Sequence, residues 1–526
     1  MPRITIDNRT IDVEANTSII KAAERVGIYI PRYCYHPSLS IVATCRMCIV
    51  EVEKAPKLMP ACSTQVMDGM VVHTDTEKVK SARKEILEFL LINHPLDCPI
   101  CDQAGECFLQ DYYMDYGLYH SRFRQEDKIR RRKRRIIGNN LVLDNERCIL
   151  CSRCVRFLQE VTKTEELTVA ERGDNSEIDL REGKTVDNPY SLNLADICPV
   201  GAITSRDFRF QSRVWFLQRT NSICTGCATG CNVEAHHRNG KVYRLLPRHN
   251  GNVNGHWMCD FGRLSYKVLM SESRVTKADI RVNEGINPGN IKDVLKETIK
   301  IIEKIIKDNG ADSIGVMGSA NQSLENNLAL AEFARKSIGT KNICMDFPFE
   351  QGIKDGILIN KDPMPNSSGA RLIHTANNGI SIDQFFSLLK AGRIKLVIVS
   401  GNDLYFFREK LSEVLSDAPK PKIIGFMSDM SNFPWQVDCI LPVPTCFEER
   451  GMFINYAGLL QKTEPAVSAK DGIKPLWELL NEASLLMGKS IELKDRSAIL
   501  GKLSQTIKEI NGITYEKIGE KGVKVL

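Results

Sequence analysis

The feature that most constrains this chain is the placement of its cysteines. The 526 residues include 18 cysteines, of which fifteen lie between Cys34 and Cys259. A chain of this length can build several domains with hydrophobic cores of their own, so it does not need disulfides for stability. The grouped thiols therefore indicate metal binding in the first half, and the second half is expected to fold as an ordinary protein domain.

Composition favours a reducing, aqueous compartment. The sequence contains no run of about eighteen apolar residues, and its opening, MPRITIDNRTIDVE, lacks the apolar core of a signal peptide. We therefore expect a cytoplasmic protein, soluble or peripheral on the cytoplasmic face of a membrane. The net charge of +6 is modest and does not favour nucleic acid as a partner.

The first set of four cysteines follows a segment with strand and helix patterns. Apolar and polar residues alternate on both sides of Asn8 and Arg9, which predicts a hairpin, and residues 17–27 have helical spacing with Asn16 or Thr17 as cap. Two strands and a helix are how a ferredoxin-like β-grasp fold begins. The ligands expected for a [2Fe-2S] cluster are Cys34, Cys45, Cys48 and Cys62. A zinc site is the less favoured alternative, since zinc ligands usually come as two close pairs.

Two further sets have the spacing of cubane ligands. After an amphipathic helix expected over residues 79–93, one irregular loop carries His94, Cys98, Cys101 and Cys107. The segment NERCILCSRC and a distant Cys-Pro carry Cys148, Cys151, Cys154 and Cys198. We expect one [4Fe-4S] cluster in each set, with the neutral imidazole of His94 making the oxidised cluster less anionic. A second CxxCxxC triplet is missing and Leu158 stands where another cysteine would be, so the later set is expected to hold a single cluster.

A fourth set has the pattern CxxCxxxC followed by one late cysteine. Its members are Cys224, Cys227, Cys231 and Cys259. Turns at Asn239-Gly240 and Asn250-Gly251 should form the hairpins that bring Cys259 back, and we expect another [4Fe-4S] cluster here. The nearby histidines are expected to be solvated loop residues rather than ligands: His236, His237 and His256.

Positive charge accompanies the ligand sets. We interpret KIRRRKRR, residues 128–135, as balancing anionic clusters or facing an acidic partner subunit, rather than as a nucleic-acid patch. Four arginines lie next to ligands and either raise cluster potentials by stabilising the reduced form or are ordinary surface residues: Arg46, Arg147, Arg153 and Arg156.

The motif HPLDCPICDQAGEC resembles the G subunit of NADH-quinone oxidoreductase (complex I) and its relatives among soluble hydrogenases and formate dehydrogenases. The first set resembles the variant [2Fe-2S] domain at the start of the complex I G subunit and of iron-only hydrogenases. The stretches RCILCSRCVRFLQEVTKTEELTVAERGDNSEI and NPYSLNLADICPVGAITSRDFRFQSRVW are similar to the G subunit as well. The fourth set resembles the iron-sulfur domain that opens the catalytic subunits of molybdenum and tungsten bis-pterin enzymes.

The second half has the pattern of an α/β domain. Buried-strand runs occur at 312–320, 394–402 and 421–429, and an amphipathic helix is expected over 324–338. The segments GSANQSLENNLALAEFARKSIGTKNI and ILPVPTCFEERGMFINYAGLLQKTEPAV look like the pterin-enzyme fold.

The residues that such an enzyme would need for molybdenum are not where the resemblance puts them. Cys344 comes too early and is followed by Met345, and Glu350 stands nearer the expected position. We therefore expect a shortened scaffold without molybdopterin, with Cys344, Cys439 and Cys446 as small buried hydrophobic residues.

The expected fold is multidomain α+β, with a β-grasp [2Fe-2S] domain, helical and loop-rich [4Fe-4S] domains, and a truncated α/β molybdopterin-oxidoreductase-like domain. The expected bounds are 1–78 for the [2Fe-2S] domain, 79–118 for the [4Fe-4S] domain with one histidine and three cysteine ligands, 119–215 for the ferredoxin-like [4Fe-4S] domain, 216–272 for the fourth cluster, 273–490 for the scaffold and 491–526 for a C-terminal tail.

Three functions compete. We favour an electron-transfer subunit, since the sequence has no GxGxxG fingerprint after a strand and no P-loop, and iron-sulfur clusters take single electrons rather than a hydride. The resemblance implies a flavoprotein F-like partner and a small E-like [2Fe-2S] partner, with hydrogenase, transhydrogenase or membrane quinone-reducing subunits downstream. A soluble flavin-bifurcating hydrogenase, transhydrogenase or formate dehydrogenase subunit is the alternative to complex I. A catalytic pterin subunit and an iron-only hydrogenase are less favoured, because the required cysteine motifs are missing.

Overall fold

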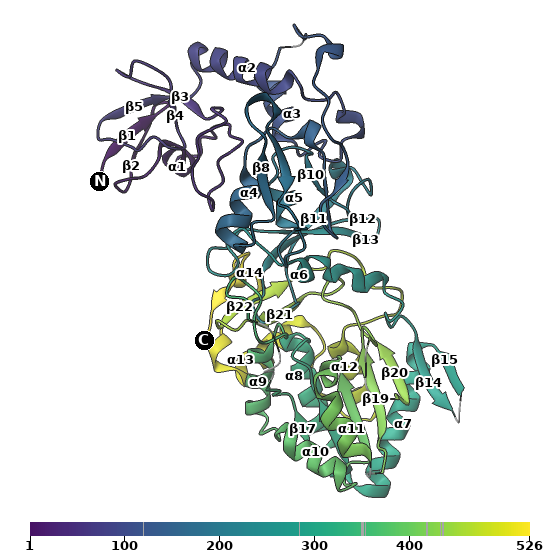
Figure 1. Cartoon of the computed structure of the whole chain (residues 1–526). Helices are drawn as coiled ribbons and strands as arrows, with labels where there is room; N and C mark the ends of the chain where they lie inside the picture. The colour runs from purple at the N-terminus through teal and green to yellow at the C-terminus, as the bar shows by residue number, and fades with distance from the viewer. Residues whose placement is uncertain are drawn as a thin grey trace. The chain divides into compact units, whose positions relative to one another are not determined.

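The computed structural model describes residues 1–526 except 119, 283–284, 349–351, 353, 417–418, 432 and 434–435. The chain divides into two compact units, Met1–Leu217 and Gln218–Leu526, drawn from purple to blue and from teal to yellow in Figure 1. Both units mix helices with strands, as expected for the α+β class.

The first unit opens with a five-stranded sheet of order β2-β1-β5-β3-β4. Its strands are β1 (Arg3–Ile6), β2 (Arg9–Asp12), β3 (Ile49–Val52), β4 (Met59–Pro60) and β5 (Met70–His73). Strands β1 and β2 form the expected hairpin, which turns through Asp7 (φ 43°) and Asn8 (φ 67°). Strand β5 pairs in parallel with β1 and antiparallel with β3.

The first helix begins later than expected. Helix α1 (Ile19–Arg25) has Ser18 as its N-cap, so the expectation that Asn16 or Thr17 caps it is wrong. Asn16 has a left-handed backbone (φ 65°), and the Thr17 hydroxyl donates to the Glu14 carbonyl at 2.7 Å instead. Both residues are used by the turn that precedes the helix.

Two helices pack beside the second ligand set. Helix α2 (Glu77–Leu91) starts two residues before the predicted 79, because the Thr76 hydroxyl accepts a hydrogen bond from Val79 N at 3.3 Å and so caps it. The buried Arg83 on α2 donates to the Ile49 carbonyl at 3.0 Å and thereby ties this helix to β3. Helix α3 (Phe108–Tyr116) packs against α2.

The rest of the first unit surrounds the third ligand set with short elements. A three-stranded sheet has the order β10-β7-β6, and β8 pairs with β9. The strands are β6 (Arg135–Ile136), β7 (Leu141–Leu143), β8 (Leu167–Ala170), β9 (Glu177–Leu180) and β10 (Ile203–Ser205). The helices are α4 (Arg153–Phe157), which continues as a π-helical turn over Leu158–Thr162, and α5 (Asn193–Ile197).

The second unit begins with a three-stranded sheet of order β11-β12-β13. Its strands are β11 (Gln218–Ile223), β12 (Asn232–Arg238) and β13 (Lys241–Pro247), and the short helix α6 (Asp260–Leu264) follows. The predicted turn at Asn239-Gly240 is present, with φ of 50° and 73°. These two positive values give the turn that best matches the twist of a hairpin.

A seven-stranded sheet of order β15-β14-β20-β19-β18-β16-β17 forms the centre of the second unit. Neighbouring strands from β20 to β17 pair in parallel, and β14 pairs antiparallel with both β20 and the edge strand β15. The bounds are β14 (Ala278–Val282), β15 (Gly285–Gly289), β16 (Ile314–Met317), β17 (Ile343–Cys344), β18 (Leu396–Ser400), β19 (Lys422–Met427) and β20 (Cys439–Pro442). The three strands expected from the sequence are β16, β18 and β19.

Helices pack around this sheet, as Figure 1 shows. They are α7 (Ile291–Asn309), α8 (Leu324–Glu332), α9 (Ser367–Ala376), α10 (Ile382–Lys390), α11 (Arg408–Ser416) and α12 (Leu476–Leu486). Helix α8 continues as a π-helical segment to Ile338, as the predicted span requires. It is not amphipathic, however, because all nine of its residues are buried among α9, α12, α13 (Arg496–Thr506) and β21 (Gly451–Ile454).

The residues expected to form a C-terminal tail are packed into the second unit. Strand β23 (Val523–Lys524) pairs with β22 (Leu459–Thr463), which pairs with β21, and α14 (Tyr515–Ile518) contacts β22. Ile499 and Leu503, four residues apart on α13, are fully buried in the same hydrophobic cluster as the sheet. Among the described residues, we find no helix with the length and apolarity needed to cross a membrane.

Candidate metal centres

The four predicted ligand sets are called sites 1 to 4 in chain order. Site 1 is Cys34, Cys45, Cys48 and Cys62; site 2 is His94, Cys98, Cys101 and Cys107; site 3 is Cys148, Cys151, Cys154 and Cys198; site 4 is Cys224, Cys227, Cys231 and Cys259. Sites 1 to 3 lie in the first unit and site 4 lies in the second.

The thiols of site 1 lie in two pairs. The side chains of Cys34 and Cys45 are hydrogen bonded to each other, and so are those of Cys48 and Cys62. The hydrogen bond from Cys45 lowers the pKa of Cys34 to about 5, and that with Cys62 raises the pKa of Cys48 far above its usual range. A [2Fe-2S] cluster takes two thiolates on each of two irons, so this paired arrangement fits it.

The loop that carries three site 1 thiols has a strained backbone. Ala43 and Arg46 flank Cys45 with φ of 49° and 60°, in the left-handed region that non-glycine residues seldom adopt. The same loop directs the Cys34 N–H toward Cys45 Sγ at 3.4 Å. Main-chain donors aimed at sulfur stabilise thiolate ligands.

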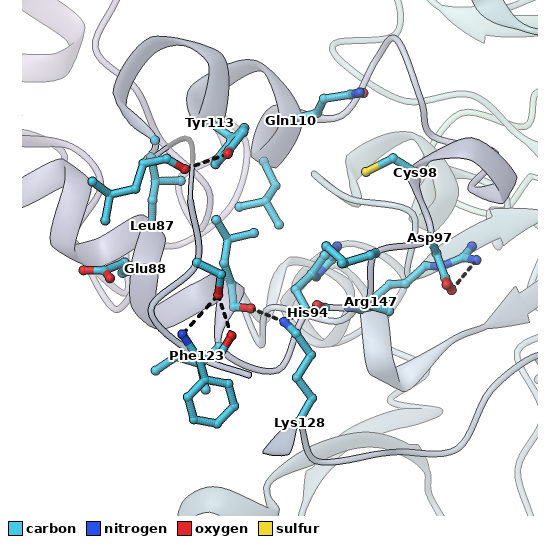
Figure 2. Close-up of a pocket in the computed structure, with 18 of the residues that line it drawn as sticks. Leu87, Glu88, His94, Asp97, Cys98, Gln110, Tyr113, Phe123, Lys128 and Arg147 are labelled. Carbon is cyan, nitrogen blue, oxygen red and sulfur yellow. Dashed lines mark hydrogen bonds and ion pairs between the residues drawn. The ribbon is translucent and has the colours of Figure 1, made fainter. Parts of the chain in front are cut away.

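Site 2 lines a cavity of about 930 Å³ between α2, α3 and the loops that follow them. Figure 2 shows His94, Cys98 and Arg147 among the side chains around this space. Burial lowers the pKa of His94 to about 4, and Lys128 and Arg147 contribute in the same direction. The imidazole is therefore neutral at ordinary pH, which is the form that binds metal. The Lys128 ammonium donates to the main-chain oxygen of His94 at 2.9 Å.

The thiols of site 3 surround a cavity of only about 20 Å³ that is otherwise lined mainly by apolar side chains. Burial raises the pKa of all four thiols, that of Cys151 to about 11. Leu150 and Ser152 have left-handed φ of 52° and 57°, and Leu150 N donates to Cys148 Sγ at 3.4 Å. The triplet thus wraps one small space, as one face of a cubane requires.

Site 3 is connected directly to site 2. The residue after Cys107 and the residue after Cys198 are hydrogen bonded, from Phe108 N to Pro199 O at 3.0 Å. Gly201 lies so close to Cys101 that a Cβ at this position would be 2.3 Å from the Cys101 sulfur. Thiols from sites 1, 2 and 3 also pack in one hydrophobic cluster with Tyr33, Leu109 and Tyr112. The fold therefore gathers the three sets into one region of the first unit.

The four arginines next to the predicted ligands differ in burial. Arg46 is exposed, as the surface alternative expects, whereas Arg147, Arg153 and Arg156 are buried. Arg147 donates to the Asp97 carboxylate, next to Cys98, at 3.0 Å. For these three arginines the surface alternative is wrong.

Part of the basic segment 128–135 is paired with carboxylates of its own unit. Lys133 pairs with Asp97 at 2.9 Å and with Glu146 at 2.7 Å, and Arg135 pairs with Asp179 at 2.7 Å. Arg132 pairs with the same Asp179 at 2.7 Å. Lys133 of this segment thus connects the site 2 loop, at Asp97, with the site 3 loop, at Glu146.

Site 4 occupies the turn between β11 and β12 and the start of α6. Cys224 N donates to the Cys231 carbonyl at 2.7 Å, which closes the loop on itself. A Cβ on Gly262 would be 2.6 Å from the sulfur of Cys224 and 3.5 Å from that of Cys259. A glycine is needed here because the two thiols approach the same backbone atom from the two ends of the hairpin region.

The expectation that Cys446 is a small buried hydrophobic residue is wrong, because this cysteine is only partly buried and is hydrogen bonded near site 4. Cys446 Sγ lies 3.1 Å from the hydroxyl of Thr225, the residue after Cys224, so this cysteine contacts the ligand loop from a distant segment. Cys344 and Cys439 are fully buried in apolar clusters, as expected. Glu350 lies outside the described residues.

The three histidines of the site 4 region are not solvated loop residues as a group. His236 is buried on β12, accepts from Arg244 Nε at 3.1 Å and is hydrogen bonded to Glu234 at 2.7 Å. A register shift between His236 and His237 turns the first of them inward. His237 lies on the same strand, beside Thr220 at 2.9 Å. His256 lies in a turn, as expected, but it is half-buried and its ring stacks on that of His249.

The residues present fit iron-sulfur clusters in three respects. The donors are thiols with one neutral imidazole, glycines at Gly201 and Gly262 leave room against ligand sulfurs, and the buried Nε of Arg153 has no hydrogen-bond partner in the described part of the chain. Within the described residues, no three His, Cys, Asp or Glu side chains form a group that could hold a single ion. A [4Fe-4S] cubane does not need ligands that converge on one point, because each of its four ligands binds a different iron.

Four family models match successive parts of the chain. They are described as a 2Fe-2S iron-sulfur cluster binding domain (residues 2–77), an NADH-ubiquinone oxidoreductase-G iron-sulfur binding region (83–122), an NADH-quinone oxidoreductase subunit 3 ferredoxin-like domain (138–204) and an NADH-ubiquinone oxidoreductase NDSU1/NuoG-like 4Fe-4S domain (217–267). Each match contains one of the four sites.

Curated relatives with similar sequences are also subunits of NADH-quinone or NADH-ubiquinone oxidoreductases. The chain is 39% identical over 343 residues to the mitochondrial NADH-ubiquinone oxidoreductase 78 kDa subunit of Candida albicans, which covers 65% of this chain and 47% of that protein. It is 40% identical over 342 residues to the NADH-quinone oxidoreductase G subunit of Rickettsia bellii, covering 65% and 49%. A solved NAD+-reducing [NiFe]-hydrogenase is 29% identical with a TM-score of 0.37, covering 40% of this chain and 91% of that one. The chain thus spans about half the length of the curated relatives it matches. In sequence it resembles the G subunit of NADH-quinone oxidoreductase and the 78 kDa subunit of the mitochondrial enzyme, and it carries 2Fe-2S and 4Fe-4S domains.

Proposed function

We propose that this chain is the iron-sulfur electron-transfer subunit of a multisubunit NAD(P)H-linked oxidoreductase. The observation that carries the proposal is the gathering of sites 1, 2 and 3 in one region of the first unit, joined through shared hydrophobic packing and direct hydrogen bonds. Electron transfer needs successive carriers held close together, whereas separate structural metal sites do not.

Site 1 would hold one [2Fe-2S] cluster, and sites 2, 3 and 4 would each hold one [4Fe-4S] cluster. When bound, such clusters accept and donate single electrons. The chain's own residues supply the ligands, exclude water by burying Cys34, Cys48 and Cys62, and hold the buried positive charges of Arg147, Arg153 and Arg156 beside the ligand loops. A positive charge favours the more reduced, more negative state of a nearby group.

The partners follow from the chemistry of the donor. A nicotinamide gives up a hydride, so a flavin must stand between it and one-electron carriers. We propose that an F-like flavoprotein and a small E-like [2Fe-2S] subunit supply that step, and that hydrogenase, transhydrogenase or membrane quinone-reducing subunits take the electrons. The assembly would lie in the cytoplasm or on the cytoplasmic face of a membrane.

The finer fold is part of the proposal. The mixed five-stranded sheet with parallel β1 and β5 supports a β-grasp domain over 1–78. We keep the expected divisions at 79–118, 119–215 and 216–272 for the three [4Fe-4S] domains and propose that the α/β remainder is a molybdopterin-oxidoreductase-like scaffold without that cofactor. Site 4 would be a side branch rather than a member of the main path.

Metal analysis of anaerobically purified protein tests the proposal. We expect about fourteen irons and as many labile sulfides per chain and no molybdenum, with electron paramagnetic resonance (EPR) signals of one [2Fe-2S] and several [4Fe-4S] clusters after reduction. Stoichiometric molybdenum or tungsten would instead make this chain a catalytic pterin subunit. Zinc in place of iron would remove the electron-transfer function altogether.

A further inference from the structure

Two buried arginines on α4 connect site 1 with site 3. Arg153 and Arg156 are each 5% exposed and lie one turn apart on the helix that begins inside the site 3 triplet. Their guanidinium groups reach back across more than a hundred residues of sequence to the loop of site 1, at Cys34, Tyr35 and Ser40.

Each guanidinium donates to a carbonyl of, or next to, a ligand of each site. Arg156 Nη2 donates to the carbonyl of Cys34 at 2.5 Å and to that of Cys151 at 3.3 Å. Arg153 donates to the carbonyl of Tyr35, next to Cys34, at 2.6 Å and to that of Ile197, next to Cys198, at 3.0 Å. Both residues therefore make the same kind of bridge, from the first ligand of site 1 to a ligand of site 3.

The same helix holds the site 1 loop at a third point. The Glu160 carboxylate, on the π-helical turn that continues α4, accepts from Ser40 N at 2.8 Å and from the Ser40 hydroxyl at 2.5 Å. Arg156 also donates to the Ser40 carbonyl. The loop of site 1 thus has little freedom to move relative to site 3.

Among the described residues, neither arginine is paired with a carboxylate, because Glu160, one turn beyond Arg156, accepts from Ser40 instead. The acceptors of Arg153 and Arg156 are main-chain carbonyls and the Ser152 hydroxyl. A buried cation without a counter-charge costs several kcal/mol. The thiols of Cys34, Cys151 and Cys198 are close enough to act electrostatically on Arg153, so anionic ligands of both sites are the available counter-charge.

We propose that Arg153 and Arg156 are positioning residues that lock the site 1 loop onto site 3 and share their positive charge between the two sites, so that the reduction potentials of both clusters are set together. This inference rests on the proposed function. It goes beyond tuning of one cluster by its own neighbour, because a single side chain would then act on two clusters held by ligands far apart in sequence.

Redox titration of Arg156→Gln, followed by EPR, tests the proposal, with Arg156→Lys and Arg46→Gln as matched variants. In Arg156→Gln we expect the site 1 and site 3 signals to be present and both potentials to shift to more negative values, while site 2 keeps its potential. Arg156→Lys keeps the charge and should restore most of the shift. Arg46→Gln removes an exposed arginine that is also adjacent to a ligand, and it should shift neither potential.

The inference is overturned if only one of the two potentials moves, if neither moves, if lysine restores nothing, or if Arg46→Gln shifts them as strongly. Should Arg156→Gln lose iron, Arg153→Gln provides the same comparison through its own pair of carbonyls. Failure of the proposed function looks different, because the unsubstituted protein itself would then lack the two clusters in metal analysis.

Discussion

Replacing Gly201 with alanine should empty site 2 while sites 1, 3 and 4 stay filled. The new methyl carbon would lie 2.3 Å from Cys101 Sγ and 3.1 Å from the Cβ of Gln103. Unbonded heavy atoms approach to about 3.5 Å, so the Cys101 sulfur would have to move by roughly 1.2 Å. Metal ligands tolerate about 0.2 Å, so that displacement is too large for iron to follow.

The cost of the substitution falls on the site more than on the fold. Overpacking of this kind costs about 1–3 kcal/mol, which a unit that extends from Met1 to Leu217 can absorb. The Cys101 main chain is held by Arg213, whose Nη1 donates to its carbonyl at 2.5 Å, so the loop cannot simply move aside.

Iron and labile-sulfide analysis with EPR measures the outcome. Gly201→Ala should hold about ten irons in place of about fourteen, with the site 2 signal missing. Gly251→Ala is the control, because its new methyl group would meet no atom within 4 Å, and it should keep the full content. A Gly201→Ala protein with full iron and an unchanged site 2 signal would refute the close approach on which the reasoning depends.

Three further outcomes are expected. Cys151→Ala and Cys224→Ala should each lose about four irons, but only Cys151→Ala should stop NADH-linked turnover of the assembled complex. Loss of turnover in Cys224→Ala but not in Cys151→Ala would contradict the proposal that site 4 is a side branch. Burial raises the pKa of Glu449 to about 8, so the folded chain keeps a proton that the unfolded chain has lost above about pH 4.3. The free energy of unfolding of the second unit should therefore fall as pH rises from about 5 to 8, and Glu449→Gln should flatten that dependence in thermal denaturation at a series of pH values. Arg83→Met leaves the Ile49 carbonyl and the Tyr116 hydroxyl without their donor. Urea denaturation should therefore show that the free energy of unfolding falls by about 1–3 kcal/mol. A fall below about 0.5 kcal/mol would contradict the contribution of this contact between α2 and β3.

The four sites could be predicted from the sequence because short gaps between cysteines leave few ways to arrange them. CxxC spacing places two thiols on one tight loop whatever the rest of the chain does, and alternation around Asn8 fixes a hairpin in the same local way. The strands β16, β18 and β19 were equally accessible, since continuous apolar runs bounded by turn residues indicate buried parallel strands.

Features that depend on hydrogen bonds to residues far away in the sequence could not be predicted from the sequence pattern. The polar residues Asn326 and Asn327 give α8 the pattern of an amphipathic helix, yet both are buried. Asn326 donates to Glu449 at 2.9 Å and Asn327 to the Ser319 carbonyl at 2.8 Å, so long-range hydrogen bonds replace the water that the pattern implies. The expectation for His236 is wrong for the same reason, because Glu234 and Arg244 satisfy its ring inside the sheet.

Buried charge and strained backbone at the site 3 loop both support the proposal that this loop holds an anionic cluster. Leu150 and Ser152 hold left-handed conformations that cost about 1–2 kcal/mol each. Arg153 and Arg156 add buried cations that donate to neutral carbonyls. An anionic cluster at the thiols would offset both costs at once, because it accepts hydrogen bonds from the main chain and balances the charge. Neither cost is explained by a loop whose only role is to connect β7 to α4.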